Sequence, residues 1–177
     1  DISGDIDVDG TTNLDVVDVD GAANFAADVT FADGADIITA SAGTSNFRAG
    51  VNAGNSIESG GNYNVVVGDE AGTAITTGDN NVAVGYAALL VNTTGGDNVA
   101  VGINALDANT EGVSNNGLGA FSLTANTTGN NNVAVGRAAL AANTTASNNT
   151  AVGNNALVAN TTGTANVAVG ALAGDAL

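Results

Sequence analysis

The segment Asp5-Ile-Asp-Val-Asp-Gly10 places carboxylates at the spacing of a calcium-binding loop. In such loops the first, third and fifth side chains supply oxygen ligands, and the glycine permits a sharp turn. The twelfth position should carry a bidentate Glu, but Val16 stands there and no helical pattern flanks the segment. Asp5, Asp7 and Asp9 are therefore a weak calcium candidate, and the alternative is a strand with one solvated acidic face. We predict no other cofactor.

Residues for catalysis are scarce. The chain has no His, Cys or Lys, so Ser-His-Asp and Cys-His systems and lysine Schiff bases cannot be assembled. A carboxylate pair for glycoside cleavage needs only Asp and Glu, and Asp69-Glu70 and Glu111 remain as candidates by elimination. Such a site also needs a groove with larger aromatic residues, and aromatic residues are only 3% of this chain. We predict no catalytic residues and no enzyme activity.

Charge narrows the range of partners. The chain carries 18 acidic residues against Arg48 and Arg137, and its formal net charge is −16. An acidic chain cannot hold a phosphate backbone by counterion release, and it lacks the basic cluster that docks on anionic lipid. No apolar run approaches the roughly 18 residues of a membrane span. We predict neither nucleic-acid binding nor membrane insertion.

Repeated Asn and Thr residues raise two further possibilities. Sequons for N-glycosylation begin at Asn92, Asn126, Asn143, Asn148 and Asn160. An outward row that includes Asn92 and Thr94 could bind ice on a flat solenoid face. In both cases the favoured interpretation is turn chemistry, because Asn and Thr side chains satisfy backbone groups in turns.

These residues belong to a 17-residue repeat, which is the strongest signal in the sequence. The unit reads Asn-Val-Ala-Val-Gly, two variable residues, Ala-Leu, two more, and then Asn-Thr-Thr-Gly; residues 81–97 are a clear copy. About eight units fill residues 46–177, and the first is an 18-residue variant. The period is too short for helical repeats and suits one coil of a parallel β-roll. Because the cores of stacked coils are narrow, Ala and Val can fill them.

The alternation within Val-Ala-Val is a period-two pattern and predicts a strand in every coil. The fourth position of the unit is always aliphatic, so we predict that it forms the core. Its members are Val67, Val84, Val101, Leu118, Val135, Val152 and Val169. The second position is Val in most copies but Asn116 and Thr150 in two. The third residue of the unit is small, which suggests that its face of the strand packs closely against another surface. A neighbouring chain is one possibility for that surface. The sixth position varies freely, as expected of an outward site.

Three further rows follow from the repeat. The ninth position is predicted to form a second core row, which consists of Leu89, Leu106, Leu123, Leu140 and Leu157. A glycine ends each strand, where the chain must turn; the set includes Gly68, Gly85, Gly102, Gly136, Gly153 and Gly170. Stacking also places one asparagine of each coil in a row, and such rows can hydrogen-bond along the stack. The members of this row are Asn92, Asn109, Asn126, Asn143 and Asn160.

Residues 1–40 are organised differently. Val8-Asp9-Gly10 recurs as Val19-Asp20-Gly21, 11 residues later, and ten of the 18 acidic residues fall within residues 1–36. We predict a short-period β shaft over residues 1–40 that leads into a β-roll over residues 41–177.

The pattern at Asn81–Leu89 and Asn132–Leu140 resembles the head repeats of trimeric autotransporter adhesins, which build a left-handed parallel β-roll. The longer unit with Asn-Thr-Thr-Gly looks more like tail-fibre repeats of marine bacteriophages, and Asp9–Leu14 is similar to the shafts of such fibres. The resemblance spans nearly the whole chain. It implies a homotrimer, a location outside the cell on a virion tail fibre or a cell surface, and contact with a host receptor or glycan.

We therefore predict an all-β, parallel β-solenoid that forms a trimeric fibre segment, a rigid spacer or attachment rod. A bacterial surface adhesin or a self-assembling extracellular filament subunit is the alternative within the same class. An ice- or glycan-binding β-solenoid is the alternative from another class. It would be a monomer with one flat, regular exposed face.

Overall fold

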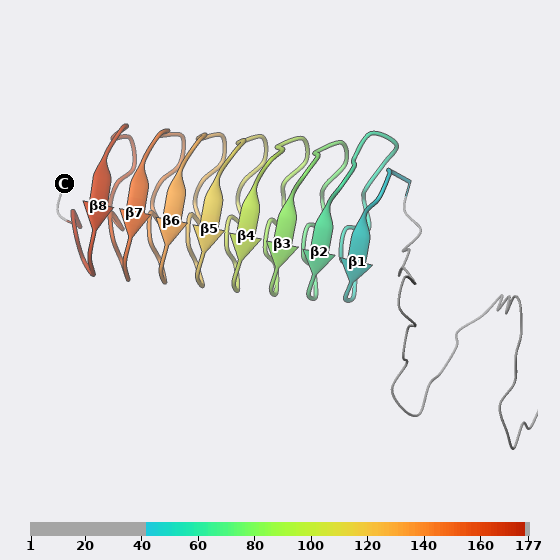
Figure 1. Ribbon diagram of the computed structural model, residues 1–177, viewed down its shortest axis with the longest axis horizontal. Helices are drawn as coiled ribbons and strands as arrows, with labels where there is room; N and C mark the ends of the chain where they lie inside the picture. Colours follow the sequence, from blue (N-terminus) through green and yellow to red (C-terminus); the bar gives the residue numbers. More distant parts are fainter. Residues whose placement is uncertain (1–41, 176–177) are drawn as a thin grey trace, which may run out of the picture. The chain divides into compact units, whose positions relative to one another are not determined.

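A computed structural model describes residues 42–175, and they form a parallel β-solenoid (Figure 1). Eight short strands pair in chain order in one parallel sheet, each with its predecessor and its successor. The strands are β1 (Phe47–Ala49), β2 (Val65–Val67), β3 (Val82–Val84), β4 (Val99–Val101), β5 (Asn116–Leu118), β6 (Val133–Val135), β7 (Thr150–Val152) and β8 (Val167–Val169). Val82 pairs with Val99, so the register equals the 17-residue repeat. This confirms the predicted fold class. The predicted shaft and the calcium candidates Asp5, Asp7 and Asp9 lie outside the described residues.

Positions 1 to 17 of a coil are counted from the Asn that precedes its strand, so coil 3 is residues 81–97 and coil 5 is residues 115–131. Each strand spans positions 2 to 4. The glycine at position 5 has a φ between 127° and 138° in every complete coil from coil 2 onward, which confirms its predicted role in the turn. Coil 3 has three more left-handed residues, Ala87, Leu89 and Asp97, with φ of 53°, 52° and 59°. Coils 4 to 7 have the same pattern, so these bends at fixed positions close a coil that has only one short strand.

The prediction for the strand's inward face was wrong. The residues at position 3 point into the coil; Ala83, Ala100, Gly117, Ala134 and Ala151 are buried. Position 4 lies on the outside, where Val101, Leu118 and Val135 are 37%, 40% and 37% exposed. Val67, Val84, Val152 and Val169 occupy the same outward row. An alternating strand has two equivalent faces by pattern alone, and the curvature of the coil brings the face with the smaller residue inside.

The second predicted core row is confirmed. The position-9 leucines of coils 3 to 7 are completely buried and pack against the inward alanines. Coils 1 and 2 fill the same space differently: glycine stands at position 9 and isoleucine at position 12. In coil 2, a Cβ on Gly72 would lie 2.7 Å from Val66 Cγ1 and 2.8 Å from Ile75 Cδ1. The isoleucine thus fills the volume that leucine occupies in later coils.

Candidate functional site

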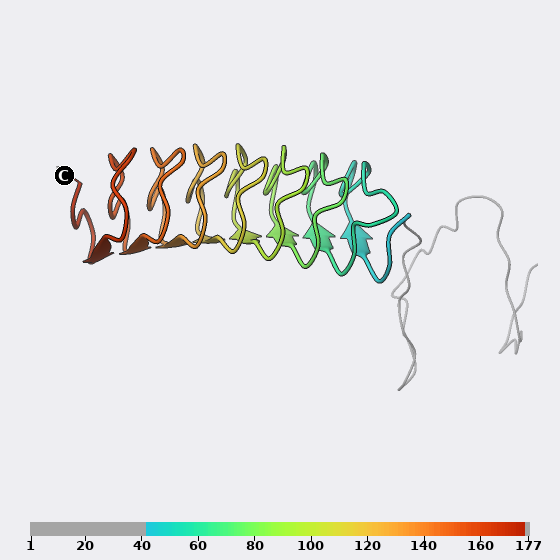
Figure 2. The same cartoon turned by 90° about the horizontal axis from the view of Figure 1, so that it is seen from above.

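The eight strands line one side of the stack (Figure 2). The outward positions of each strand are repeated in the next coil. We call positions 2 and 4 of all eight coils the strand face. Its residues are Phe47, Ala49, Val65, Val67, Val82, Val84, Val99, Val101, Asn116, Leu118, Val133, Val135, Thr150, Val152, Val167 and Val169. Successive coils are about 4.8 Å apart, so the face extends over roughly 34 Å. Most of its side chains are half-buried or exposed.

No residue of the strand face is ionisable, although the whole chain has a net charge of −16. The acidic residues of the described coils stand in the turns, as with Asp69, Asp97 and Glu111. Within strands β1 to β8 of the described residues, Arg48 is the one charged residue, and it lies at position 3 of β1, where its Nε donates to the carbonyl oxygen of Ala53 at 2.8 Å. A long aliphatic face without charge is thus carried by a strongly acidic chain.

Two rows of asparagines stabilise the coil interior. The first, the pre-strand ladder, is position 1 and consists of Asn46, Asn64, Asn81, Asn98, Asn115, Asn132, Asn149 and Asn166. In each step the backbone N–H of one member donates to the Oδ1 of the member before it, at 2.8–3.1 Å. Buried carboxamides therefore join each coil to the next. The sequence signalled this row by an invariant Asn before each strand, but we had predicted no ladder there.

The second row, the turn ladder, is position 12 of coils 3 to 7. Asn109, Asn126, Asn143 and Asn160 each donate from Nδ2 to the Oδ1 of the preceding member, at 2.8–3.3 Å. This confirms the predicted hydrogen bonding along the stack.

The two ladders meet at one carbonyl in each coil. The carbonyl oxygen of Gly95 accepts from Asn81 Nδ2 and Asn92 Nδ2, both at 2.9 Å. Coils 4 to 7 repeat this arrangement. Among the described residues, no buried side-chain nitrogen or oxygen atom lacks a hydrogen-bond partner. The asparagines are thus structural crosslinks between coils.

The turn ladder bears on two possibilities raised by the sequence, N-glycosylation and an ice-binding row. Asn92, Asn126, Asn143 and Asn160 are buried, so four of the five sequon asparagines face the interior, and Asn148 alone is exposed. The outward row of Asn92 and Thr94, which was the less favoured possibility, does not form, because Asn92 is buried. Threonines at position 14 remain exposed, but Glu111 interrupts their row.

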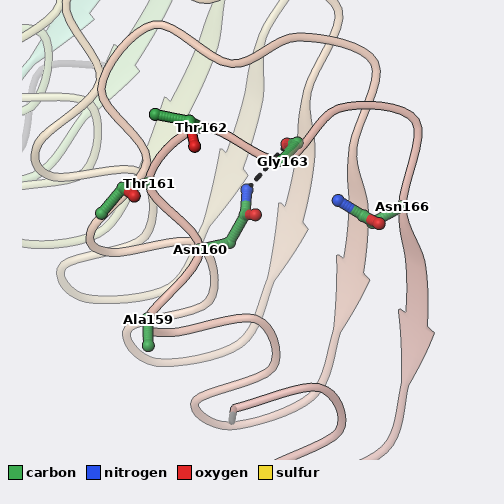
Figure 3. A pocket seen from close by; sticks show the side chains of 6 residues that line it. All are labelled: Ala159, Asn160, Thr161, Thr162, Gly163 and Asn166. Carbon is green, nitrogen blue, oxygen red and sulfur yellow. Dashed lines mark hydrogen bonds between the residues drawn. The ribbon is translucent and has the colours of Figure 1, made fainter. Parts of the chain in front are cut away.

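A hollow lies at the Asn-Thr-Thr-Gly segment of coil 7, lined by Ala159, Asn160, Thr161, Thr162, Gly163 and Asn166 (Figure 3). Asn160 Nδ2 donates across it to the carbonyl oxygen of Gly163 at 3.0 Å. In inner coils the following coil packs against the same positions, and Asn126 and Gly129, for example, are buried. The hollow is the uncovered end of the described stack, and no ionisable side chain lines it.

The three carboxylates that remained as catalytic candidates lie in two different coils. Asp69 is exposed, and the neighbouring Glu70 accepts from Asn52 Nδ2 at 2.9 Å and from Thr73 Oγ1 at 3.2 Å. Glu111 stands two coils further on, at position 14 instead of positions 6 and 7. Nowhere in residues 42–175 do three or more His, Cys, Asp or Glu side chains gather as a metal site.

The variable sixth position faces outward, as predicted. Tyr86 and Ile103 are 53% and 51% exposed there, and Arg137 is also exposed. The Arg137 guanidinium lies 5.8 Å from the centre of the Phe121 ring in the preceding coil. This row varies in size and charge from coil to coil, in contrast to the strand face.

The chain matches no protein-family model, and neither the curated proteins nor the solved structures gave a match. In the described part of the chain, no helix has the length and hydropathy needed to cross a membrane. The strand face and the ladders are the features of the described residues that bear on function.

Proposed function

We propose that this chain is a structural rod, a segment of an extracellular or viral attachment fibre, in which copies associate through the strand face. The observation that carries the proposal is the strand face itself: two mainly aliphatic rows without an ionisable residue, on a chain with net charge −16. Exposed aliphatic rows of this length mark interaction surfaces. The rod would act by holding other parts of the fibre at a distance.

The partner that fits the strand face best is a second copy of the chain. Two acidic chains repel each other, so they can associate closely only where neither carries charge. A copy also presents rows with the same axial spacing, so the side chains of one copy can fit between those of the other. Two rows along each rod, in contact over roughly 34 Å, would bury their aliphatic side chains jointly.

The internal construction of the coils suits a mechanical role. Neighbouring coils are joined by a strand pairing, by the pre-strand ladder and, from coil 3 onward, by the turn ladder. The strand pairing and the pre-strand ladder repeat at every step of the described stack, which favours uniform stiffness along it. The resemblance to phage tail-fibre and adhesin repeats suggests three copies and a location on a virion or cell surface.

The mass in solution tests the proposal, measured by light scattering together with far-UV circular dichroism. We expect a mass near three chains and a β spectrum. A monomer with the same spectrum would overturn self-association and would favour a single-chain solenoid that binds a ligand. A very large and heterogeneous mass would replace the closed trimer with a filament subunit.

A further inference from the structure

A periodic face leaves the axial alignment of two copies poorly determined. The strand face repeats in every coil, at steps of about 4.8 Å. If one copy slides by a single coil, seven of the eight strands still find a partner strand, and at position 4 an aliphatic side chain still meets an aliphatic side chain in every pair. Aliphatic contacts alone therefore discriminate weakly between the aligned state and the shifted ones.

Two polar side chains interrupt this otherwise apolar face. At position 2, six strands carry Phe or Val, whereas β5 carries Asn116 and β7 carries Thr150. The contrast between Asn116 and its neighbour Asn115 is sharp. Asn115 Oδ1 accepts from the backbone and the side chain of Asn132, both at 3.1 Å. The Asn116 carboxamide makes no hydrogen bond to any described residue. Its hydrogen-bonding groups lie on the strand face and are open to a partner.

We propose that Asn116 and Thr150 fix the axial register of parallel copies that associate through the strand face. This inference rests on the proposed function. When parallel copies are aligned, β5 meets β5, and the Asn116 carboxamides can donate to and accept from one another. One step of slip brings Asn116 against Val99 or Val133 and buries its polar groups without a partner, which is unfavourable. A single polar residue in an apolar seam sets register in coiled coils for the same reason.

The same pair of residues disfavours an antiparallel arrangement. With eight strands fully overlapped in opposite directions, β5 faces β4 and β7 faces β2. Asn116 would then meet Val99, and Thr150 would meet Val65, so both polar side chains would lie against aliphatic ones. Only the parallel, aligned arrangement places Asn116 against Asn116 and Thr150 against Thr150.

The test uses an inter-copy distance. The chain has no Cys, so Thr128→Cys, at an exposed turn position of coil 5, gives one spin-label site away from the strand face. We expect one narrow inter-copy distance for this labelled chain by pulsed electron paramagnetic resonance. With Asn116→Val and Thr150→Val added, we expect several distances that reflect axial steps of about 4.8 Å. Because Val occupies position 2 in most other coils, both substitutions should leave the circular dichroism spectrum unchanged.

A moved polar residue gives the matched control. Asn116→Val with Val133→Asn, in the Thr150→Val background, shifts the polar side chain by one coil and should restore a single narrow distance. If the chain without Asn116 and Thr150 still associates and keeps one distance, the register inference is overturned while self-association stands. If the labelled parent chain is a monomer by light scattering, the strand face itself fails as an association surface.

Discussion

The inside of each coil and the strand face are equally regular in sequence but opposite in environment. Coil 5 shows both: Leu123 at position 9 is completely buried, and Leu118 at position 4 is 40% exposed. The inside is filled by apolar side chains together with asparagines that are all hydrogen-bonded. The strand face is mainly aliphatic, uncharged and incompletely covered by its own chain.

This difference shows that a constant aliphatic position in a repeat has two possible causes. Position 9 is constant because its side chain fills the space between stacked coils. The side chain at position 4 does not fill the space between coils, so its constant aliphatic character points to contact with another molecule. Four substitutions test the contrast between the coil interior and the strand face, and their expected effect on folding decreases from the first to the last.

Leu123→Asp should have the largest effect, because it buries a carboxylate in an apolar interior. We expect a loss of more than about 4 kcal/mol in the free energy of unfolding, or no folded chain at all. Thermal melting followed by far-UV circular dichroism measures the effect. A melting curve like that of the parent chain would contradict the assignment of Leu123 to the core.

Gly72→Leu should destabilise coil 2 by about 1–3 kcal/mol, because the new side chain overlaps Val66 and Ile75. Adding Ile75→Asn and Val66→Ala gives coil 2 the residues that coil 3 carries at positions 3, 9 and 12. We expect this triple variant to regain most of the lost stability in urea unfolding. If it is no more stable than the single variant, the two coil interiors are not interchangeable packings of one volume.

Asn126→Ala should cost about 1–3 kcal/mol, because Asn109 Oδ1 and Asn143 Nδ2 each lose a buried partner. The control is Asn154→Ala, at an exposed position where other coils carry Ala120 and Ala171; it should change stability by less than about 0.5 kcal/mol. Urea unfolding of both variants compares them. If both variants lose the same free energy of unfolding, Asn126 contributes no more to stability than an exposed asparagine does.

Leu118→Asp should have the smallest effect on the coil itself, because its side chain points outward. We expect an unchanged β spectrum and a fall in mass from the associated form to the monomer, since charges on each copy would then face one another. Light scattering measures the mass. An unfolded chain would show that position 4 belongs to the coil interior, and an unchanged mass would remove the strand face from the interface.

Much of this architecture could be predicted from residue patterns. The 17-residue spacing predicts the coil, the Val-Ala-Val pattern predicts the strand, and the glycine at position 5 predicts the turn. The buried leucines and the turn ladder were also predicted. The pre-strand ladder was missed, because an Asn before a strand can serve as an ordinary turn residue. The left-handed backbone at Leu89, with φ of 52°, was also beyond prediction, because such a conformation is rare for a leucine.

By itself, the sequence determined the period, the strand positions and the rows that stack, because these depend on local preferences repeated at a fixed spacing. Only the tertiary structure decided which side of the strand is inside. Period-two alternation marks two faces without ranking them, and Val looks more suited to a core than Ala. The bends at positions 5, 7, 9 and 17 curve the chain toward the alanine side, where only a small residue fits opposite the leucine. That choice moves the valines outward and makes them the surface on which the proposed function depends.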